Sequence, residues 1–217
     1  MIQQLKQTNR WSSIIILAGM SIFCFMLSLI RCYVTGTSLY LFLNWNLFLA
    51  FIPWLLTTII VIYKYQNKIL LLAVSGSWLL FFPNSPYILT DLFHLKFRCG
   101  APVWFDWAII LSFAWTGLMF GFISLADIEK LLKIYFGKKS IVVIIVLLLF
   151  ISGFGVYIGR FLRWNSWDVI SSPIDLGKDI VQRVIHPFIY LRTWVITFLL
   201  GAILNMMYFS LRVLNIK

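Results

Sequence analysis

The feature that most constrains the fold is a series of long apolar blocks that contain almost no charge. Residues 14–30 are the clearest case, because 17 consecutive residues include no Asp, Glu, Lys or Arg. An α-helix needs about 20 mostly apolar residues to cross a hydrocarbon core roughly 30 Å thick. The whole chain is 62% hydrophobic and 12% charged, whereas a soluble domain is about half apolar and a quarter charged. The sequence therefore predicts an all-α, polytopic membrane protein.

Six apolar blocks are predicted to be spans, although the third is short, and we expect one integral membrane domain over residues 1–217. The first block ends at Arg31 without a small-x-small cleavage site, so we interpret it as an uncleaved helix. The second contains Pro53, which we expect to kink it. The predicted spans are residues 13–30, 39–63, 66–82, 103–125, 141–158 and 188–211.

The third block is short and runs into the sequence Phe82-Pro-Asn-Ser-Pro-Tyr87. As a helix, residues 69–82 would cover only about 21 Å. Pro83 and Pro86 each disfavour α geometry in the residue before them. We therefore expect a break, a pocket or a re-entrant turn at Asn84, close to membrane depth. Non-helical backbone is tolerated there only where protein or water surrounds it.

The basic residues indicate topology rather than nucleic-acid binding. The 18 Lys and Arg residues outnumber 7 acidic ones, but they lie mostly at the ends of the apolar blocks. No basic stripe with exposed aromatic residues lies on a polar domain, so nucleic acid is not an expected partner. When Arg98, Arg160 and Arg163 are set aside as site residues, ten bases lie on the side of the termini and five on the other. The positive-inside rule then places both termini in the cytoplasm and the protein in the cell membrane.

Polar residues collect in two segments that follow the third and fifth spans. If the chain is helical from Tyr87 onward, Tyr87, Asp91, His94 and Arg98 lie at spacings of 4, 3 and 4 and form one stripe. The second segment covers residues 160–168. In a six-span protein the loops after the third and fifth spans lie on the same face, so we expect the two segments and Asp106 to converge at the extracytoplasmic interface.

This convergence defines a predicted site. Asp91 could orient His94 as a general base or proton relay, and arginine binds carboxylate or phosphate as a bidentate fork. The candidate catalytic residues are Asp91, His94 and Asp168. The candidate ligand-binding residues are Asn84, Tyr87, Arg98, Asp106, Arg160, Arg163 and Asn165. A structural cluster of ion pairs is an equal alternative. One His with scattered carboxylates is a weak metal signal, so no metal is predicted, and no cofactor motif is present.

Two further signals concern helix packing. Asn44 and Asn46 are expected to form hydrogen bonds between helices rather than to bind a ligand. Gly117 and Gly121 have the small-xxx-small spacing that allows close helix contact.

Three segments resemble the signature segments of an uncharacterised bacterial family of multi-pass membrane proteins, catalogued as domain of unknown function "thirteen sixty-one". They are Phe82-Pro-Asn-Ser-Pro-Tyr-Ile-Leu-Thr-Asp-Leu-Phe-His94, Trp104-Phe-Asp106 and Gly159-Arg-Phe-Leu-Arg-Trp-Asn-Ser-Trp-Asp168. The chain differs mildly from the family pattern, with Ser85 where Ala is common and Phe105 where Tyr is common. The resemblance implies a membrane protein without an established activity.

The leading functional hypothesis is a polar site that binds or modifies an anionic lipid or an envelope precursor. A small-solute or proton-coupled transporter is the first alternative, suggested by the broken third span. A non-catalytic membrane assembly factor is the second. The sequence does not decide whether the protein is an enzyme, which substrate it has, or its oligomeric state.

Overall fold

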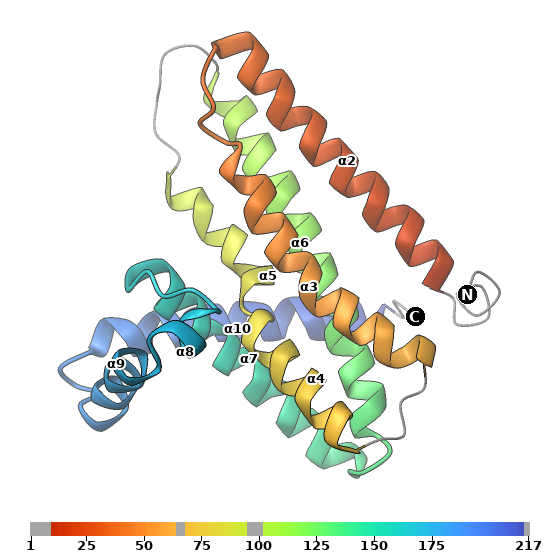
Figure 1. Ribbon diagram of the computed structural model, residues 1–217, viewed down its shortest axis with the longest axis vertical. Coiled ribbons are helices and arrows are strands. Elements are labelled where there is room, and N and C mark those ends of the chain that lie inside the picture. Colours follow the sequence, from red (N-terminus) through yellow and green to blue (C-terminus); the bar gives the residue numbers. More distant parts are fainter. Residues whose placement is uncertain (1–9, 64–67, 95–101, 215–217) are drawn as a thin grey trace. The chain divides into compact units, whose positions relative to one another are not determined.

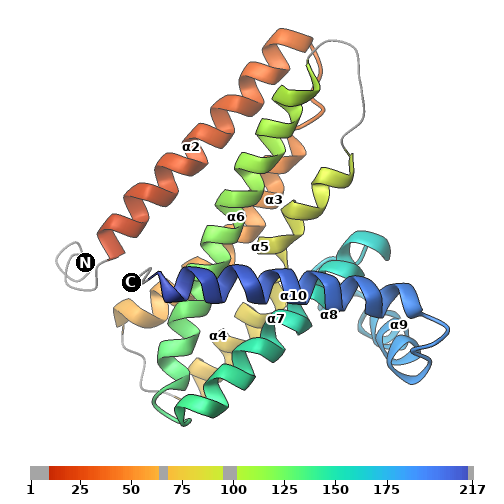
Figure 2. The same ribbon diagram turned by 180° about the vertical axis from the view of Figure 1, so that it is seen from behind.

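A computed structural model describes residues 10–63, 68–94 and 102–214, and these residues form helices and no strand (Figures 1 and 2). Six helical segments are long and apolar enough to cross a membrane, which confirms an all-α polytopic protein. The chain divides into two compact units, Met1–Lys130 and Leu131–Lys217, and we describe each by itself. The expectation of one integral domain stays a prediction.

The first unit is built around α6 (Val103–Leu132), whose buried residues occur along its whole length. α2 (Arg10–Thr35) and α3 (Phe42–Tyr63) contribute side chains to the same hydrophobic core. α3 contains Pro53 within the helix, as expected. The core also includes Ile88 from the segment after the proline break, so the break is part of the packed interior.

The third span is longer than predicted. α4 (Lys68–Phe81) is short, as expected, but α5 (Asn84–Tyr87) and the 3-10 helix η1 (Ile88–His94) continue in the same general direction (Figure 1). Residues Ile69–Phe93 together form one apolar candidate span. The helix before the break ends at Phe81, next to the predicted end at residue 82, and the apolar sequence resumes directly after the prolines.

The backbone at the break is enclosed by protein. The Asn84 amide donates a hydrogen bond to the carbonyl of Phe81 over 2.9 Å, so it satisfies a group that the break leaves without a helical partner. Ser85 is helical and fully buried, so its expected exclusion from α geometry was wrong. Pro86 lies in the first turn of α5, where a missing N–H costs little. A methyl group on Gly117 would come within 2.9 Å of the Ser85 carbonyl oxygen.

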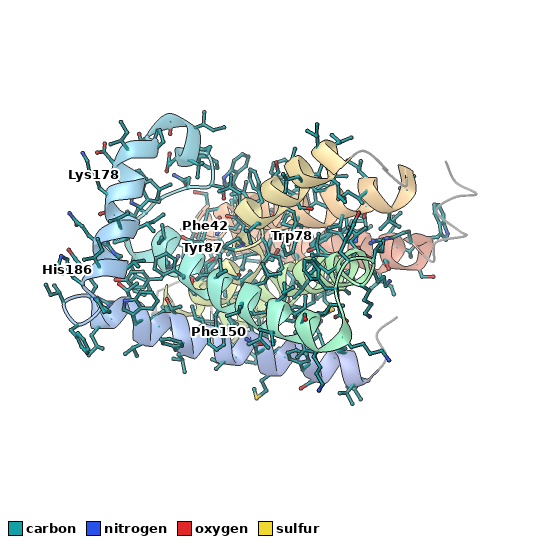
Figure 3. All side chains as sticks on the ribbon, turned by 90° about the horizontal axis from the view of Figure 1, so that it is seen from below. Phe42, Trp78, Tyr87, Phe150, Lys178 and His186 are labelled. Atoms are coloured by element: carbon teal, nitrogen blue, oxygen red, sulfur yellow. The ribbon has the colours of Figure 1, made fainter. Side chains whose placement is uncertain are left out.

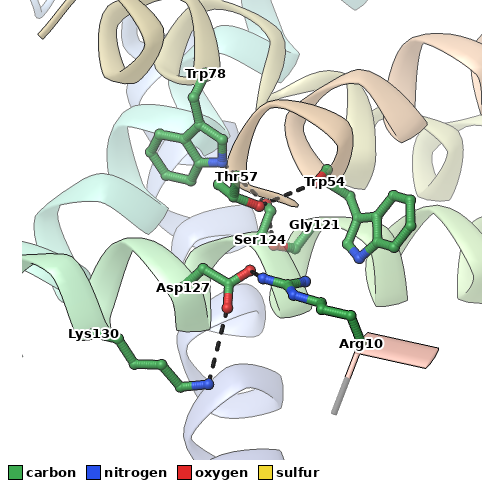
Figure 4. Close-up of polar contacts among 8 residues, drawn as sticks. All are labelled: Arg10, Trp54, Thr57, Trp78, Gly121, Ser124, Asp127 and Lys130. Atoms are coloured by element: carbon green, nitrogen blue, oxygen red, sulfur yellow. Dashed lines mark hydrogen bonds and ion pairs between the residues drawn. The ribbon is translucent and has the colours of Figure 1, made fainter. Parts of the chain in front are cut away.

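Two buried ion pairs join α2 to α6, one near each end. Arg31 pairs with Asp106. Arg10 pairs with Asp127 (Figure 4). The paired residues are 21 positions apart in both helices, which corresponds to about 31 Å along a helix axis. This length equals the hydrocarbon thickness of roughly 30 Å. No charged residue lies between the pairs on either helix. The two pairs are therefore separated along the helices by about the thickness of a hydrocarbon core.

The proline break packs on the part of α6 that lies halfway between the two ion pairs. Gly117 lies 11 residues after Asp106 and 10 before Asp127. Ser85 packs against Gly117 and Gly121, where a Cβ would come within 3.0 Å of its atoms. The small-xxx-small prediction is thus confirmed, and the close neighbour of these glycines is the broken third span.

The second unit contains α7 (Lys138–Phe161), α8 (Asp168–Ser171), α9 (Pro173–Ile185) and α10 (Leu191–Val213). α7 and α10 pack together at glycines: a Cβ on Gly153 would come within 2.8 Å of the Thr197 carbonyl oxygen. Phe150 of α7 lies directly over Gly201 of α10 (Figure 3). α8 and α9 lie in the segment that connects these two spans.

Candidate functional site

The predicted site residues are divided between the two units. Asn84, Tyr87, Asp91, His94 and Asp106 belong to the first unit, and Arg160, Arg163, Asn165 and Asp168 belong to the second. Arg98 and the side chain of His94 lie outside the described residues. The expected convergence of the two segments would join the units, and it stays a prediction.

Asp91 lies in the 3-10 helix η1, within the apolar candidate span Ile69–Phe93. Its side chain is fully buried, and the Asn46 amide of α3 donates a hydrogen bond to its Oδ2 over 3.2 Å. This contact and the bond from Asn44 to Ser28 of α2, at 3.0 Å, confirm the expected hydrogen bonds between helices. A carboxyl group buried in a span is costly, and such groups are common at functional sites.

The polar stripe after the break has a different geometry from the predicted one. Residues Ile88–His94 form a 3-10 helix with three residues per turn instead of 3.6. A spacing of four residues no longer returns to the same face, so Tyr87 and Asp91 are separated by about a third of a turn. The three-residue spacing of Asp91 and His94 matches the 3-10 period. The expectation of one α-helical stripe was therefore wrong.

Asp106 has partners within its own unit. Its two carboxylate oxygens accept hydrogen bonds from Arg31 at 2.6 and 3.3 Å, and the Tyr40 hydroxyl donates to one of them over 3.1 Å. Arg31 and Asp106 are each about 2% exposed. This geometry is the bidentate fork expected of a strong Arg–carboxylate pair. It supports a structural role for Asp106, while its predicted role in ligand binding stays a prediction.

In the second unit, α7 ends in a turn that presents Arg163. Arg163 has a φ of 63°, the only positive value at a non-glycine residue in the described chain. Helices commonly end with a glycine in this left-handed conformation, and another residue there costs about 1–3 kcal/mol. The Arg163 side chain is exposed. The strained backbone therefore holds an exposed guanidinium directly after the end of a span.

The carboxylate of Asp168 accepts hydrogen bonds from residues in and after this turn. Its Oδ2 accepts the backbone N–H of Asn165 at 2.6 Å, and its Oδ1 accepts the Ser171 hydroxyl at 3.0 Å. The pKa of Asp168 is lowered, chiefly by the hydrogen bond from the Asn165 backbone. Desolvation opposes this shift, and the hydrogen bonds from the Ser171 and Asn165 side chains add to it. Asp168 is thus an ionised acceptor that shapes the turn. Its predicted catalytic role stays a prediction.

The turn is also attached to α9. The Trp164 indole N–H donates to Asp179 over 2.7 Å, and Arg183 bonds the same carboxyl group over 3.1 Å. Arg183 in turn lies over the ring of Tyr190 at 4.8 Å. These contacts connect the end of α7, α9 and the start of α10 into one polar network beside the turn.

The sequence analysis did not identify three of these partners: Arg31, Asn46 as the partner of Asp91, and Asp179. One signal was present, because Arg10 and Arg31 have the same spacing in α2 as Asp106 and Asp127 have in α6. Asp179 carried no such signal. Among the described residues, no group of three His, Cys, Asp or Glu side chains is placed to hold a metal ion.

Comparison with known proteins gives a family and no activity. No curated protein and no solved structure matches the chain. Residues 45–207 match the family described as "Protein of unknown function (DUF1361)". This match covers the third span, the turn after α7 and most of α10. The chain therefore belongs to this family of proteins of unknown function.

Proposed function

We propose that the turn after α7 binds the phosphoryl headgroup of an anionic lipid or of a lipid-linked envelope precursor at the extracytoplasmic membrane surface. The observation that carries this proposal is Arg163, an exposed guanidinium in a strained left-handed conformation at the end of a span. Backbone strain that surrounding contacts maintain is concentrated at ligand sites. Headgroup phosphate is the anion available at this depth, and guanidinium binds it bidentately.

The surrounding contacts fit a turn that is preorganised for this ligand. Asp168 keeps its charge and accepts three hydrogen bonds from the turn itself, so it is held within the turn. Trp164 is anchored through Asp179, and Trp167 is exposed beside the turn. Tryptophan is enriched at headgroup depth, where one end of its ring is wet and the other apolar.

The test compares lipid preference in purified full-length protein. Native mass spectrometry counts the phosphatidylglycerol and phosphatidylcholine molecules retained from mixed nanodiscs. Arg163→Gly suits the test because glycine favours the left-handed conformation, so the turn keeps its shape and loses only the guanidinium. A charge-assisted hydrogen bond contributes about 1.5–3 kcal/mol, so we expect the preference for phosphatidylglycerol to fall about tenfold or more.

The matched control is Lys178→Ala, which removes one exposed positive charge from the same connecting segment. A charge near a membrane surface contributes about 1 kcal/mol, and we expect a loss of about fivefold or less. Equal losses in both variants would contradict a specific site. Displacement of phosphatidylglycerol by excess inorganic phosphate would identify a soluble phosphate, rather than a lipid, as the ligand.

A second candidate function is proton-coupled transport through the first unit. Two observations favour it: the third span is broken where it packs on Gly117 near mid-membrane, and Asp91 is buried within the same span. Transporters place broken helices and ionisable groups at such positions. In proteoliposomes with a K⁺ gradient and valinomycin, a pH dye would report proton entry that Asp91→Asn abolishes. Equal proton entry with both proteins would contradict this candidate.

A further inference from the structure

The connecting segment between α7 and α10 exposes an unusual amount of apolar surface. On α9, Ile174, Val181 and Ile185 are 71%, 52% and 63% exposed. At 100° per residue, these three side chains lie within about 40° of one another on the helix circumference. Phe188, which follows the helix in the sequence, is 90% exposed. A soluble surface rarely carries large apolar patches.

The other faces of α9 have different neighbours. Leu176 and Arg183 are buried, and the Trp194 indole of α10 donates to the Arg183 carbonyl over 3.1 Å. Lys178 lies at the edge of the apolar face, about 20° from Ile185, and it forms an exposed ion pair at 3.3 Å with Asp175 on the polar face beyond it. Figure 3 shows Lys178 projecting outward from α9. The helix therefore has one face toward its own unit, one polar face and one apolar face without a partner in this unit.

The position of α9 in the chain restricts what can cover the apolar face. α7 ends at Phe161 and α10 begins at Leu191, and both are candidate spans. Residues 162–190 must therefore leave and re-enter the membrane at the same surface. A helix with a strong apolar face, a charged face and low overall hydrophobicity lies in that surface. The structure assigns α9 as an interfacial helix that inserts Ile174, Val181 and Ile185 into the lipid leaflet.

This assignment has a consequence for Arg163, which rests on the proposed function. Trp164, the residue after Arg163, is bonded to Asp179 of α9 over 2.7 Å. The depth of α9 in the leaflet therefore sets the depth of the turn. With its apolar face about 5–10 Å into the boundary between headgroups and acyl chains, α9 holds the Arg163 guanidinium level with the lipid phosphates.

Spin-label accessibility tests the assignment in full-length protein reconstituted in phosphatidylcholine vesicles that contain phosphatidylglycerol. Single cysteines replace Val181, Ile185, Asp175 and Gln182 after Cys24, Cys32 and Cys99 are changed to Ala. We expect labels at 181 and 185 to collide mainly with oxygen, which concentrates in lipid, and labels at 175 and 182 mainly with a water-soluble nickel chelate. The matched pairs differ only in the face of the helix.

Two outcomes would overturn the assignment. Access of the nickel chelate to 181 and 185 would mean that the face is in water. Exclusion of both reagents would mean that protein, such as a second copy of this chain, covers it.

A second variant tests the coupling between α9 and Arg163. Trp164→Phe should leave the accessibility pattern unchanged and lower the phosphatidylglycerol preference at least threefold. An unchanged preference would contradict the coupling. Arg163→Gly leaves α9 in the leaflet, so failure of the headgroup site and failure of the interfacial helix give different results.

Discussion

Arg31 illustrates how a single charge can hold a membrane helix in register. Its guanidinium is about 2% exposed and makes a two-bond contact with Asp106, to which Tyr40 adds a third bond. Burying either charge alone would be costly, because neither water nor a counter-charge would replace the lost solvation. The pair therefore restricts which residue of α6 can lie opposite the end of α2.

We expect Arg31→Met to lower the free energy of unfolding by about 3–5 kcal/mol, because it leaves a buried carboxylate without its counter-charge. Unfolding in mixed micelles with increasing SDS measures this change. The double variant Arg31→Met/Asp106→Leu should recover part of the loss, since no charge is then left unpaired. Lys130→Met is the control: Lys130 is 68% exposed and lies 3.9 Å from Asp127, so it should cost about 1 kcal/mol or less.

Asp168 predicts a pH dependence of the Arg163 turn. Hydrogen bonds, first that from the Asn165 backbone, lower the pKa of Asp168. The carboxylate therefore stabilises the turn at pH values above the ordinary Asp pKa of about 3.9, and this contribution is lost as the pH falls through the lowered pKa. A ¹⁹F label on a cysteine at Trp167 should shift with a midpoint below about 3.9. The same shift in Asp168→Asn, or a midpoint above the ordinary value, would contradict this role.

At the scale of helices, glycine determines which elements come close together. Gly117 and Gly121 make room for the broken third span, and Gly153 and Gly201 allow α7 and α10 to pack. Small residues at such contacts let backbones approach, which matters in a membrane because lipid and side chains are equally apolar. The sequence spacing indicated the first pair. The second pair lies on two different helices, so no local spacing could reveal it.

We expect Gly153→Ala to destabilise the second unit, because its Cβ would lie 2.8 Å from the Thr197 carbonyl oxygen and 3.1 Å from the Gly201 nitrogen, both of them backbone atoms. Overpacking of this kind costs about 1–3 kcal/mol, and a lower Tm in detergent would report it. Gly177→Ala in α9 is the control, because nothing lies within 4 Å of its Cβ position. It should instead stabilise α9 by about 0.5–1 kcal/mol. Equal effects of the two changes would contradict the packing argument.

At the scale of the whole molecule, six spans would put both termini on the same side of the membrane, and the distribution of bases predicts that this side is the cytoplasm. Lys139 and Lys178 lie on opposite sides of the α7 span. With cytoplasmic termini, a membrane-impermeant maleimide should label a cysteine at Lys178 in intact cells and one at Lys139 only after permeabilisation. The background again lacks the three native cysteines. The reverse pattern would place the Arg163 turn in the cytoplasm and contradict the predicted topology.

Much of this architecture is encoded locally. Apolar blocks alone predicted six spans, because the cost of exposing backbone and charge to lipid acts on each segment separately. The same reasoning located the break at Pro83 and the short helix before it. It did not predict that the helices α5 and η1 follow directly after the prolines. It also assumed α periodicity where the chain adopts a 3-10 helix.

The sequence by itself therefore determined that this is a six-span membrane protein, where its polar segments lie, and to which family it is similar. Tertiary structure decided what those polar groups contact: Arg31 and Asp106 are 75 positions apart, and Asn46 and Asp91 are 45 apart. The physical reason is that hydropathy acts residue by residue along the chain. An ion pair or a buried hydrogen bond instead depends on which two helices pack together and at which register.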